Sequence, residues 1–563
     1  MEPRPWHRFY DEGVPASLNY LDLTLPQILD RTAERYKDRS AVLFEGLRLT
    51  YGQLKDAVDR FASALQAMSI KKGDKIAIQL PNLPQTIIAY YGVLKAGGIA
   101  VMTNPLYVAR EIEHQFNDAG CRACIVADFL WMQKVREIRD KLPCEFYVLT
   151  GIKDFLPFPK NFLFPFVAKK TGTVVKVPSE KGVYWLKDLL DRYEPNPKPI
   201  EYDMEDICNL QYTGGTTGLS KGAILTHKNL SYNVQQCRAW FPIVEEGREV
   251  ILSALPFFHS FGLTVCMNFA ILIAGVQIPV PNPRDIKKLI SLIQKYKVTL
   301  FPGVPTLFNA INQFPGIDKV DISSVKGCIS GSAPLPIEVA QRFEQLTGGS
   351  IIEGYGLTET SPVSHANPLV NKARRKIGSI GLPVPDTDCK IVDLEEGTKE
   401  LPPGQDGEVI IKGPQVMKGY YNRPDETAQV LRDGWLYTGD IGKMDEDGYF
   451  YIVGRKKEMI IAGGYNIYPR EIDEILYEHP KILEACAIGV PDPHRGETVK
   501  AFVVLKPGES ATEQEIIEYC KTKLAAYKVP KMIEFRQELP KSTVGKVLRR
   551  VLKDEEMAKI KKQ

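Results

Sequence analysis

One glycine-rich stretch determines the fold class of this chain: Tyr212-Thr213-Gly214-Gly215-Thr216-Thr217-Gly218-Leu219-Ser220-Lys221-Gly222. It directly follows a strand-like run at 207–211. Glycines allow tight turns that point successive backbone N–H groups at an anion, and the hydroxyls and the lysine add donors and positive charge. The lysine precedes the last glycine, which excludes a Walker A loop, and no G-x-G-x-x-G dinucleotide pattern is present. The stretch predicts a phosphate-binding loop. A glycine-rich surface loop is the alternative from composition alone.

Four further segments follow this loop in the order that is typical of adenylate-forming enzymes. They are residues 354–359 (Gly-Tyr-Gly-Leu-Thr-Glu), 437–440 (Tyr-Thr-Gly-Asp), 454–465 and 540–546 (Pro-Lys-Ser-Thr-Val-Gly-Lys). With the loop, they make the chain resemble acyl-CoA synthetases, coumarate-CoA ligases, firefly luciferase and the adenylation domains of peptide synthetases. The resemblance extends from about residue 51 to residue 550. It is strongest to bacterial medium- and long-chain fatty acyl-CoA synthetases, through residues 463–471.

The length and the patterning predict the fold class. A chain of 563 residues exceeds one hydrophobic core, so two or more domains are expected. Helical and strand patterns alternate through the first four-fifths, which predicts α/β layers with a largely parallel sheet. We expect an α/β fold with a large N-terminal domain over 1–454, including a β-rich subdomain over about 382–454, and a small α+β C-terminal domain over 455–563. The resemblance implies that the small domain is mobile.

Composition and charge are those of a soluble enzyme. The net charge is +3 without a block of basic residues, which argues against nucleic acid as a partner. Ten scattered cysteines indicate a reducing compartment, and the Cys121/Cys124 pair is interpreted as buried and structural. The N-terminus lacks the apolar core of a signal peptide. The apolar stretch 263–276 is too short to span a membrane, so we interpret it as a buried core segment. A cytoplasmic protein is therefore expected.

The resemblance implies a nucleotide-binding role for each segment. The loop would hold the phosphates that leave, Thr358 and Glu359 would act at the α-phosphate with Glu359 as the Mg²⁺ ligand, and Asp440 and Arg455 would bind the ribose hydroxyls. A hard cation that takes only one or two protein oxygens is compatible with a single glutamate beside a hydroxyl. The implied phosphate residues are Thr213, Gly214, Gly215, Thr216, Thr217, Gly218, Ser220 and Lys221, and the implied adenine residues are Gly331, Ser332, Ala333, Gly354, Tyr355 and Gly356.

The resemblance also places functional residues in the last hundred residues. Lys546 would neutralise charge as the acid attacks the α-phosphate, and Lys457 matches the hinge position. Gly463 and Gly464 would line the path of the thiol, since glycine allows close backbone approach. His259 matches a position beside the acyl pocket, with a structural histidine as the equally weighted alternative. No general-base partner for His259 is recognisable in the sequence.

The reaction implied is activation of a medium- or long-chain fatty acid by ATP with Mg²⁺, followed by transfer to coenzyme A. An aryl- or coumarate-type CoA ligase shares every motif and remains an alternative. A non-catalytic fatty-acid carrier or sensor is the alternative from another class, and a phosphotransferase is the alternative outside the family. The nucleotide product distinguishes a phosphotransferase from a ligase of this type, because the phosphotransferase releases ADP and the ligase releases AMP.

A segment at 155–167 carries five phenylalanines among three prolines and is followed by Lys169 and Lys170. The prolines argue against a continuous helix. Two interpretations are open: aromatic side chains that pack back onto the large domain, or a peripheral contact with the inner face of the membrane. A homodimer is likewise left open by the sequence.

Overall fold

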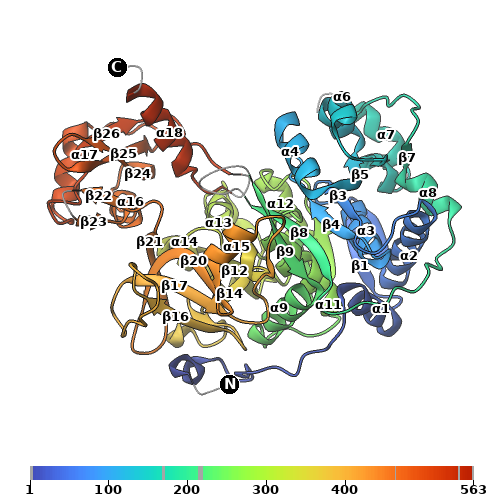
Figure 1. The fold of residues 1–563 in the computed structure, drawn as a ribbon, viewed down its shortest axis with the longest axis horizontal. Coiled ribbons are helices and arrows are strands. Elements are labelled where there is room, and N and C mark those ends of the chain that lie inside the picture. The colour runs from blue at the N-terminus through green and yellow to red at the C-terminus, as the bar shows by residue number, and fades with distance from the viewer. Residues whose placement is uncertain (1–3, 168–171, 214–219, 463–464, 543–544, 561–563) are drawn as a thin grey trace. The chain divides into compact units, whose positions relative to one another are not determined.

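The glycine-rich stretch joins two strands of an eight-stranded sheet, in the order β18-β9-β8-β4-β3-β5-β6-β7 (Figure 1). The five pairings from β8 to β7 are parallel, whereas β9 pairs antiparallel with both β8 and β18. The strands are β3 (Lys75–Gln79), β4 (Ile99–Met102), β5 (Cys121–Ala127), β6 (Phe146–Thr150), β7 (Val183–Trp185), β8 (Ile207–Thr213), β9 (Lys221–Thr226) and β18 (Gly419–Tyr420). The computed structural model describes residues 4–167, 172–213, 220–462, 465–542 and 545–560.

Helices between consecutive strands cover this sheet, as the alternating pattern predicts. The helix α3 between β3 and β4 is almost wholly buried and packs against both strands and against α2. The helix α9 begins at Thr226, whose hydroxyl accepts a hydrogen bond from the Asn229 N–H and so caps the first turn. The helices of this layer are α2 (Tyr51–Ala67), α3 (Pro84–Lys95), α4 (Ala109–Ala119), α8 (Leu186–Arg192) and α9 (His227–Trp240).

Two further sheets position the strand ends that carry the adenine motifs. One has the order β10-β11-β1-β2 and the other β12-β13-β14-β15, and Leu300 bridges between them to Ile251 and Gly327. Because β12 and β13 are parallel, with Ser330 opposite Glu353, the residues after Ser330 lie beside those after Glu353. The strands are β1 (Ser40–Phe44), β2 (Leu47–Thr50), β10 (Val250–Ser253), β11 (Val276–Pro279), β12 (Gly327–Ser330), β13 (Ser350–Gly356), β14 (Val363–Ala366) and β15 (Leu382–Pro383).

The helices of this part are amphipathic or wholly buried, except for α15, which has no buried residue. The stretch 263–276 is buried, with a π-helical turn at Leu263–Asn268 followed by α11, so its assignment to the core is confirmed. The helices are α1 (Leu25–Arg35), α10 (Ser260–Gly262), α11 (Phe269–Leu272), α12 (Ile286–Tyr296), α13 (Pro305–Asn312), α14 (Ile337–Thr347) and α15 (Pro424–Val430). No helix in the described ranges is long and apolar enough to cross a membrane.

The chain divides into two compact units, Met1–Asp388 with Lys412–Gly434, and Cys389–Ile411 with Trp435–Gln563. The second unit contains the short strands predicted after residue 382, where β17 pairs antiparallel with β20 and β20 with β21. These strands are β16 (Asp388–Val392), β17 (Gly407–Lys412), β20 (Trp435–Met444) and β21 (Phe450–Arg455). The domain bounds expected at 382, 454 and 455 stay a prediction, because compactness does not say which residues move together.

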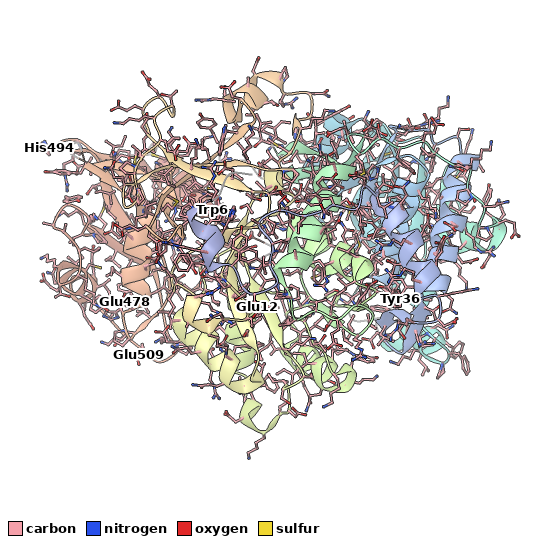
Figure 2. All side chains as sticks on the ribbon, turned by 90° about the horizontal axis from the view of Figure 1, so that it is seen from below. Trp6, Glu12, Tyr36, Glu478, His494 and Glu509 are labelled. Atoms are coloured by element: carbon pink, nitrogen blue, oxygen red, sulfur yellow. The ribbon has the colours of Figure 1, made fainter. Side chains whose placement is uncertain are left out.

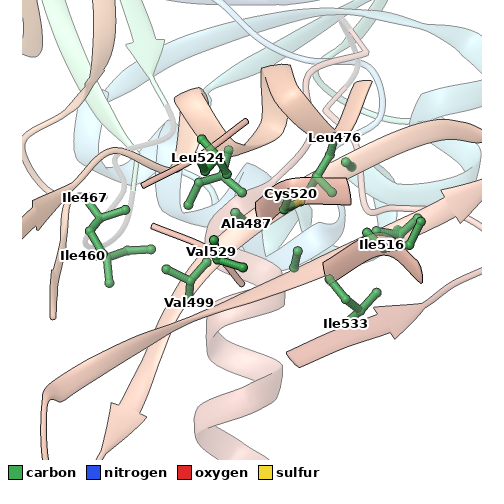
Figure 3. Packing of buried hydrophobic residues seen from close by; sticks show 14 of the residues in the cluster. Ile460, Ile467, Leu476, Ala487, Val499, Ile516, Cys520, Leu524, Val529 and Ile533 are labelled. Carbon is green, nitrogen blue, oxygen red and sulfur yellow. The ribbon is translucent and has the colours of Figure 1, made fainter. Parts of the chain in front are cut away.

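A five-stranded sheet and three helices form the rest of the second unit. Figure 3 shows its core, where Leu476, Ile516 and Cys520 from the helices pack on Val499 and Ile533 from the sheet. Turns leave Glu478, His494 and Glu509 exposed on the surface of this unit (Figure 2). The elements are β22 (Ile460–Ala462), β23 (Tyr465–Ile467), β24 (Ile482–Asp492), β25 (Gly496–Leu505), β26 (Met532–Phe535), α16 (Pro469–Tyr477), α17 (Glu513–Lys521) and α18 (Arg549–Ile560).

The phenylalanine-rich segment differs from its expected structure. A 3-10 turn ends at Phe155, and the α-helix α7 (Lys160–Val167) follows with Pro165 inside it, so the prolines interrupt the segment without excluding a helix. The helix begins after Pro159, whose carbonyl oxygen accepts hydrogen bonds from the Phe162 and Leu163 N–H groups. Three of the segment's five phenylalanines are not packed onto the large domain, because Phe158, Phe162 and Phe166 are 84%, 67% and 73% exposed, whereas Phe155 and Phe164 are half-buried.

Candidate active site

The strand hairpin places the two ends of the phosphate loop side by side. Thr213, the last residue of β8, is the register partner of Lys221, the first residue of β9. Ser220 is held from outside the hairpin by His114, whose Nε2 lies 3.0 Å from the Ser220 carbonyl oxygen. The predicted phosphate residues Gly214, Gly215, Thr216, Thr217 and Gly218 lie outside the described residues.

Lys221 lies in a cluster of groups contributed by the segment 418–426. Its Nζ forms an ion pair with Glu426 of α15 and lies 5.5 Å from the ring centroid of Tyr420. The strand β18 brings Tyr420 there, because it pairs with Ala223 in β9. Lysine is a compact, mobile point charge, so a phosphate that approached it would compete with the Glu426 carboxylate. Sequence reasoning missed Tyr420 and Glu426, because they lie about 200 residues from the loop without a motif.

The same tyrosine joins the phosphate loop to the predicted metal residue. The Tyr420 hydroxyl donates a 2.7 Å hydrogen bond to Oε1 of Glu359, and burial, together with the Glu359 charge, raises the pKa of Tyr420. Glu359 and Thr358 form a 3-10 turn directly after β13. The Thr358 hydroxyl lies 3.5 Å from the Ser260 hydroxyl, which brings the His259 segment beside this turn.

The predicted adenine residues come together at the ends of β12 and β13. A Cβ added to Gly331 would lie 3.5 Å from the Gly354 carbonyl oxygen, so the two glycine turns are adjacent. A Cβ on Gly356 would lie 1.8 Å from the Pro362 carbonyl oxygen, and therefore only glycine fits there. Ser332 adopts a left-handed conformation with φ 69°, as expected of a sharp turn beside Ala333.

Tyr355 lies between these glycines with its ring packed edge-on against His365, at a centroid separation of 5.7 Å. His365 is fully buried, and burial lowers its pKa to about 3, so the imidazole is neutral at physiological pH. Because His365 is neutral, it places no charge beside the Tyr355 ring. This environment suits stacking on a neutral, aromatic base.

His259 has a structural role in this arrangement. Its Nδ1 accepts a hydrogen bond from the Phe261 N–H at 3.2 Å, which makes it the N-cap of α10. The cap fixes the direction of the segment that reaches Thr358 through Ser260. An additional catalytic role for His259 stays a prediction.

The predicted ribose pair lies in the second unit. Asp440 and Arg455 are register partners on β20 and β21, and the Arg455 Nε lies 3.0 Å from the Asp440 Oδ1. The Asp440 side chain is 4% exposed, whereas that of Arg455 is 37% exposed. A buried carboxylate that is held by a more exposed guanidinium can accept hydrogen bonds from a pair of hydroxyls.

Lys546 lies close to this ribose pair within the second unit. Its backbone closes a tight turn, in which the Ser542 N–H donates to the Lys546 carbonyl oxygen at 2.7 Å. The neighbouring Arg455 guanidinium, more than burial, lowers the pKa of Lys546 to about 8, while Asp440 opposes this shift. The side chain keeps exposed surface, so we attribute the lowered pKa chiefly to the like charge.

A second arginine completes the surroundings of Lys546. Arg549, at the start of α18, pairs with Glu458 at 2.9 Å and with Asp473 at 2.8 Å. This network attaches α18 to the turn after β21, where the hinge candidate Lys457 is exposed. Gly463 and Gly464, the predicted thiol-path glycines, lie outside the described residues.

Comparison with protein-family models identifies the chain. Residues 29–421 match the model of the AMP-binding enzyme, and residues 471–546 match that of the AMP-binding enzyme C-terminal domain. The chain belongs to the AMP-binding enzyme family. This confirms the resemblance inferred from the five sequence segments and, with it, the fold class.

Members of this family that resemble the chain cover nearly all of it. A long-chain-fatty-acid–CoA ligase of Bacillus subtilis is 48% identical over 559 residues, which are 98% of each chain. A ligase of the same name from Escherichia coli O6:H1 is 41% identical over 99% of each chain. Among solved structures, an anthranilate CoA ligase in complex with anthranoyl-AMP has a TM-score of 0.84 at 26% identity, over 96% of this chain and 98% of that one. A fatty acyl CoA synthetase of Mycobacterium tuberculosis has a TM-score of 0.73 at 29% identity, over 95% and 99%.

Proposed function

We propose that this protein uses ATP to join a medium- or long-chain fatty acid to coenzyme A, with pyrophosphate and AMP as the other products. The full-length identity to ligases that bear the long-chain name supports the reaction. The geometry of the first unit supports an aliphatic acid, through the apolar pocket described next.

An apolar pocket lies behind the adenine turns. Its free volume is roughly 30 Å³, about the size of one water molecule, so an alkyl chain enters it only when the lining side chains move apart. None of its lining residues carries a charge. Ile329 lines it and also contacts the Gly354 turn, where an added Cβ would lie 2.6 Å from the Ile329 Cδ1. The lining residues are Cys237, Trp240, Phe241, Ile251, Val265, Phe269, Leu300, Pro302, Gly327, Ile329, Val363 and Ala366. An alkyl chain gains about 0.8 kcal/mol per buried methylene in such surroundings.

The residues of the first unit suit a nucleotide that brings its own magnesium ion. Thr358 and Glu359 supply one hydroxyl and one carboxylate, and within the described ranges no group of three or more metal-binding side chains is found. Mg²⁺ is often held by one or two protein oxygens together with phosphates and water, so this donor set fits. When bound, the ion would neutralise charge on the phosphates. We assign the ion to Glu359 and the phosphates to Thr213, Ser220 and Lys221.

The chemistry requires positive charge at two stages. A carboxylate oxygen of the acid attacks the α-phosphorus of ATP, and the bond to pyrophosphate breaks, which leaves an acyl-adenylate. The sulfur of coenzyme A then attacks the acyl carbon, the thiol proton is lost, and AMP departs. We assign charge neutralisation in the first step to Lys546, and binding of the ribose to Asp440 and Arg455. Fixed charges of this kind supply most of the catalysis in such reactions.

A product assay tests the proposal. The full chain is incubated with ATP, Mg²⁺, coenzyme A and either decanoate, palmitate or coumarate, and pyrophosphate and the nucleotide product are measured. We expect AMP and pyrophosphate with decanoate or palmitate. Faster release with coumarate would favour an aryl ligase, release of ADP would favour a phosphotransferase, and no release with any acid would favour a carrier.

We further propose that α7, together with Phe158 just before it, contacts an anionic lipid surface. Phe158, Phe162 and Phe166 recur every four residues, so they lie along one side of the segment, and the rings of Phe162 and Phe166 are 6.2 Å apart. Leu163 beside them is 49% exposed. In the sequence, Lys169 and Lys170 add positive charge, whereas Lys160 pairs with Glu45 at 3.4 Å. Exposed aromatic side chains beside positive charge favour the interface of an anionic bilayer.

Vesicle co-sedimentation tests the lipid contact. Phe162→Ser with Phe166→Ser should reduce binding to phosphatidylglycerol vesicles several-fold and leave the activity with dissolved decanoate unchanged. Val370→Ser with Ile377→Ser is the matched control, because these apolar side chains are 52% and 65% exposed elsewhere. Equal binding by the phenylalanine variant and the intact protein would refute the contact.

A further inference from the structure

A second cleft, separate from the apolar pocket, lies between α1, α9 and the chain segment that precedes α1. It encloses roughly 810 Å³, including its open mouth. Its floor is apolar, because Ile28 of α1 and Ile273 after α11 line it and are 3% and 1% exposed. The cleft therefore offers a buried apolar surface that is reached from solvent, and its polar lining decides which molecule would bind there.

Three arginines and one glutamate, Glu246, line this cleft. Arg35 pairs with Glu246 at 3.0 Å. Arg238 donates to the carbonyl oxygens of Phe241 and Val244, and the carboxylates of Glu246 and Glu249 act on its charge without forming an ion pair. Neither Arg238 nor Arg31 forms an ion pair with any residue that the structure describes. Both are half-buried.

The positive charges of the cleft are only partly compensated, because Glu246 is the one carboxylate among the lining residues and it pairs with Arg35. Arg31 and Arg35 are four residues apart on α1, where like charges repel by a few tenths of a kcal/mol. The dipole of α1 offsets this for Arg35 in the last turn, but Arg31 lies a turn earlier. A carboxylate or phosphate would remove the repulsion and accept paired N–H bonds from a guanidinium.

The helix α9 separates this cleft from the apolar pocket. Gln235, Arg238 and Ala239 line the cleft, whereas Cys237 and Trp240 line the pocket. The two sets are offset by two residues, which is about 200° around a helix, so they face opposite sides. A molecule in the cleft is therefore distinct from the acyl chain in the pocket, with one helix as the shared wall.

We propose that the cleft binds a single-chain anionic amphiphile, with its head group on Arg31 and Arg238 and its chain on Ile28 and Ile273. A fatty acid satisfies this chemistry, and so does an alkyl phosphate. If the bound amphiphile is also a substrate of the enzyme, that part of the proposal rests on the function proposed above. The binding itself does not rest on it, because the cleft and its charges belong to neither the phosphate loop nor the adenine turns.

Binding of decanoate to the full chain tests the site. The apolar pocket is first filled with a non-hydrolysable decanoyl-adenylate analogue, and calorimetry then measures decanoate binding. We expect about one further equivalent, and at least a tenfold weaker affinity for Arg31→Gln. Arg248→Gln is the matched control, since that arginine is 73% exposed in its side chain, pairs with Glu245 and does not line the cleft. Ala239→Phe, which fills the cleft without changing charge, should also weaken binding.

Head-group specificity and two negative results complete the test. Decanol should bind at least tenfold more weakly than decanoate, and decyl phosphate shows whether carboxylate or phosphate is preferred. The proposal is overturned by the absence of decanoate binding beyond the analogue, or by equal affinity in Arg31→Gln and the intact protein. Failure of the proposed reaction gives a different result, in which the analogue does not bind but Arg31-dependent binding of decanoate remains.

Discussion

The lowered pKa of Lys546 predicts an unusual pH dependence for the first half-reaction. A lysine neutralises charge only while it is protonated, and Arg455 lowers the pKa of Lys546 from its usual value near 10.5 to about 8. With that pKa, the protonated fraction falls from about 0.9 at pH 7 to about 0.1 at pH 9, whereas an unperturbed lysine stays almost fully charged. Because the pKa is lowered, activity is lost as the pH rises through 8, about two and a half pH units below the value for an ordinary lysine.

The assay is pyrophosphate release from ATP and decanoate in the absence of coenzyme A. We expect the rate at pH 9 to be about one-tenth of that at pH 7. Lys546→Arg provides the control, because arginine stays protonated across this range, so its lower rate should not change between the two pH values. Thiolysis of supplied decanoyl-adenylate should not fall with pH, since thiolate formation increases over the same range.

Two results would refute this reasoning. A rate for the intact protein at pH 9 within twofold of that at pH 7 would mean that Lys546 is not close to its half-protonated point. The same fall in Lys546→Arg would assign the titration to another group.

Three further substitutions have expected outcomes. Lys546→Ala should slow acyl-adenylate formation by about 10²–10³ and spare thiolysis of supplied acyl-adenylate, and equal loss of both half-reactions would contradict its role. Glu426→Gln removes the carboxylate that pairs with Lys221, and because a partly exposed ion pair contributes at most about 1 kcal/mol, the KM for ATP should fall by up to about fivefold. Asp425→Asn, the adjacent carboxylate, should leave that KM unchanged, and an equal fall in both variants would point to net charge instead. Gly356→Ala places a Cβ 1.8 Å from a backbone oxygen, so it should destabilise the first unit by about 1–3 kcal/mol or more in urea unfolding; an unchanged midpoint would mean that the turn relaxes freely.

The sequence predicted those parts of the fold and the site that depend on local pattern. The strand-like run at 207–211 before the phosphate loop and the alternation of helices with parallel strands both follow from hydrophobic periodicity. The parallel pairing of β12 with β13 then accounts for the contact between the Gly331 and Gly354 turns, although the sequence around either glycine does not indicate the other.

The remaining features depend on contacts between distant segments. Tyr420 reaches Glu359 only because a two-residue strand pairs with β9, and a strand of that length has no recognisable period. The lowered pKa of Lys546 requires the approach of Arg455, which lies 91 residues earlier in the chain. The helix α7 was missed because a proline inside it was weighed as a helix breaker, whereas the short helix forms around Pro165.

The pairing of β20 with β21 constrains which length changes this protein can tolerate. Asp440 and Arg455 face each other only in one register, and a shift of one residue would turn one of them to the opposite face of the sheet. The turn between the strands is itself fixed, since the Asp445 side chain accepts hydrogen bonds from the Asp447 and Tyr449 N–H groups. A single-residue insertion or deletion within either strand should therefore abolish nucleotide binding even where the fold survives. An insertion around residues 446–448 should disturb the turn as well, because it separates Asp445 from the N–H groups that bind it and Gly448 is buried. For anyone who grafts a tag or a sensor into this chain, both the strands and the turn of this hairpin are positions to avoid.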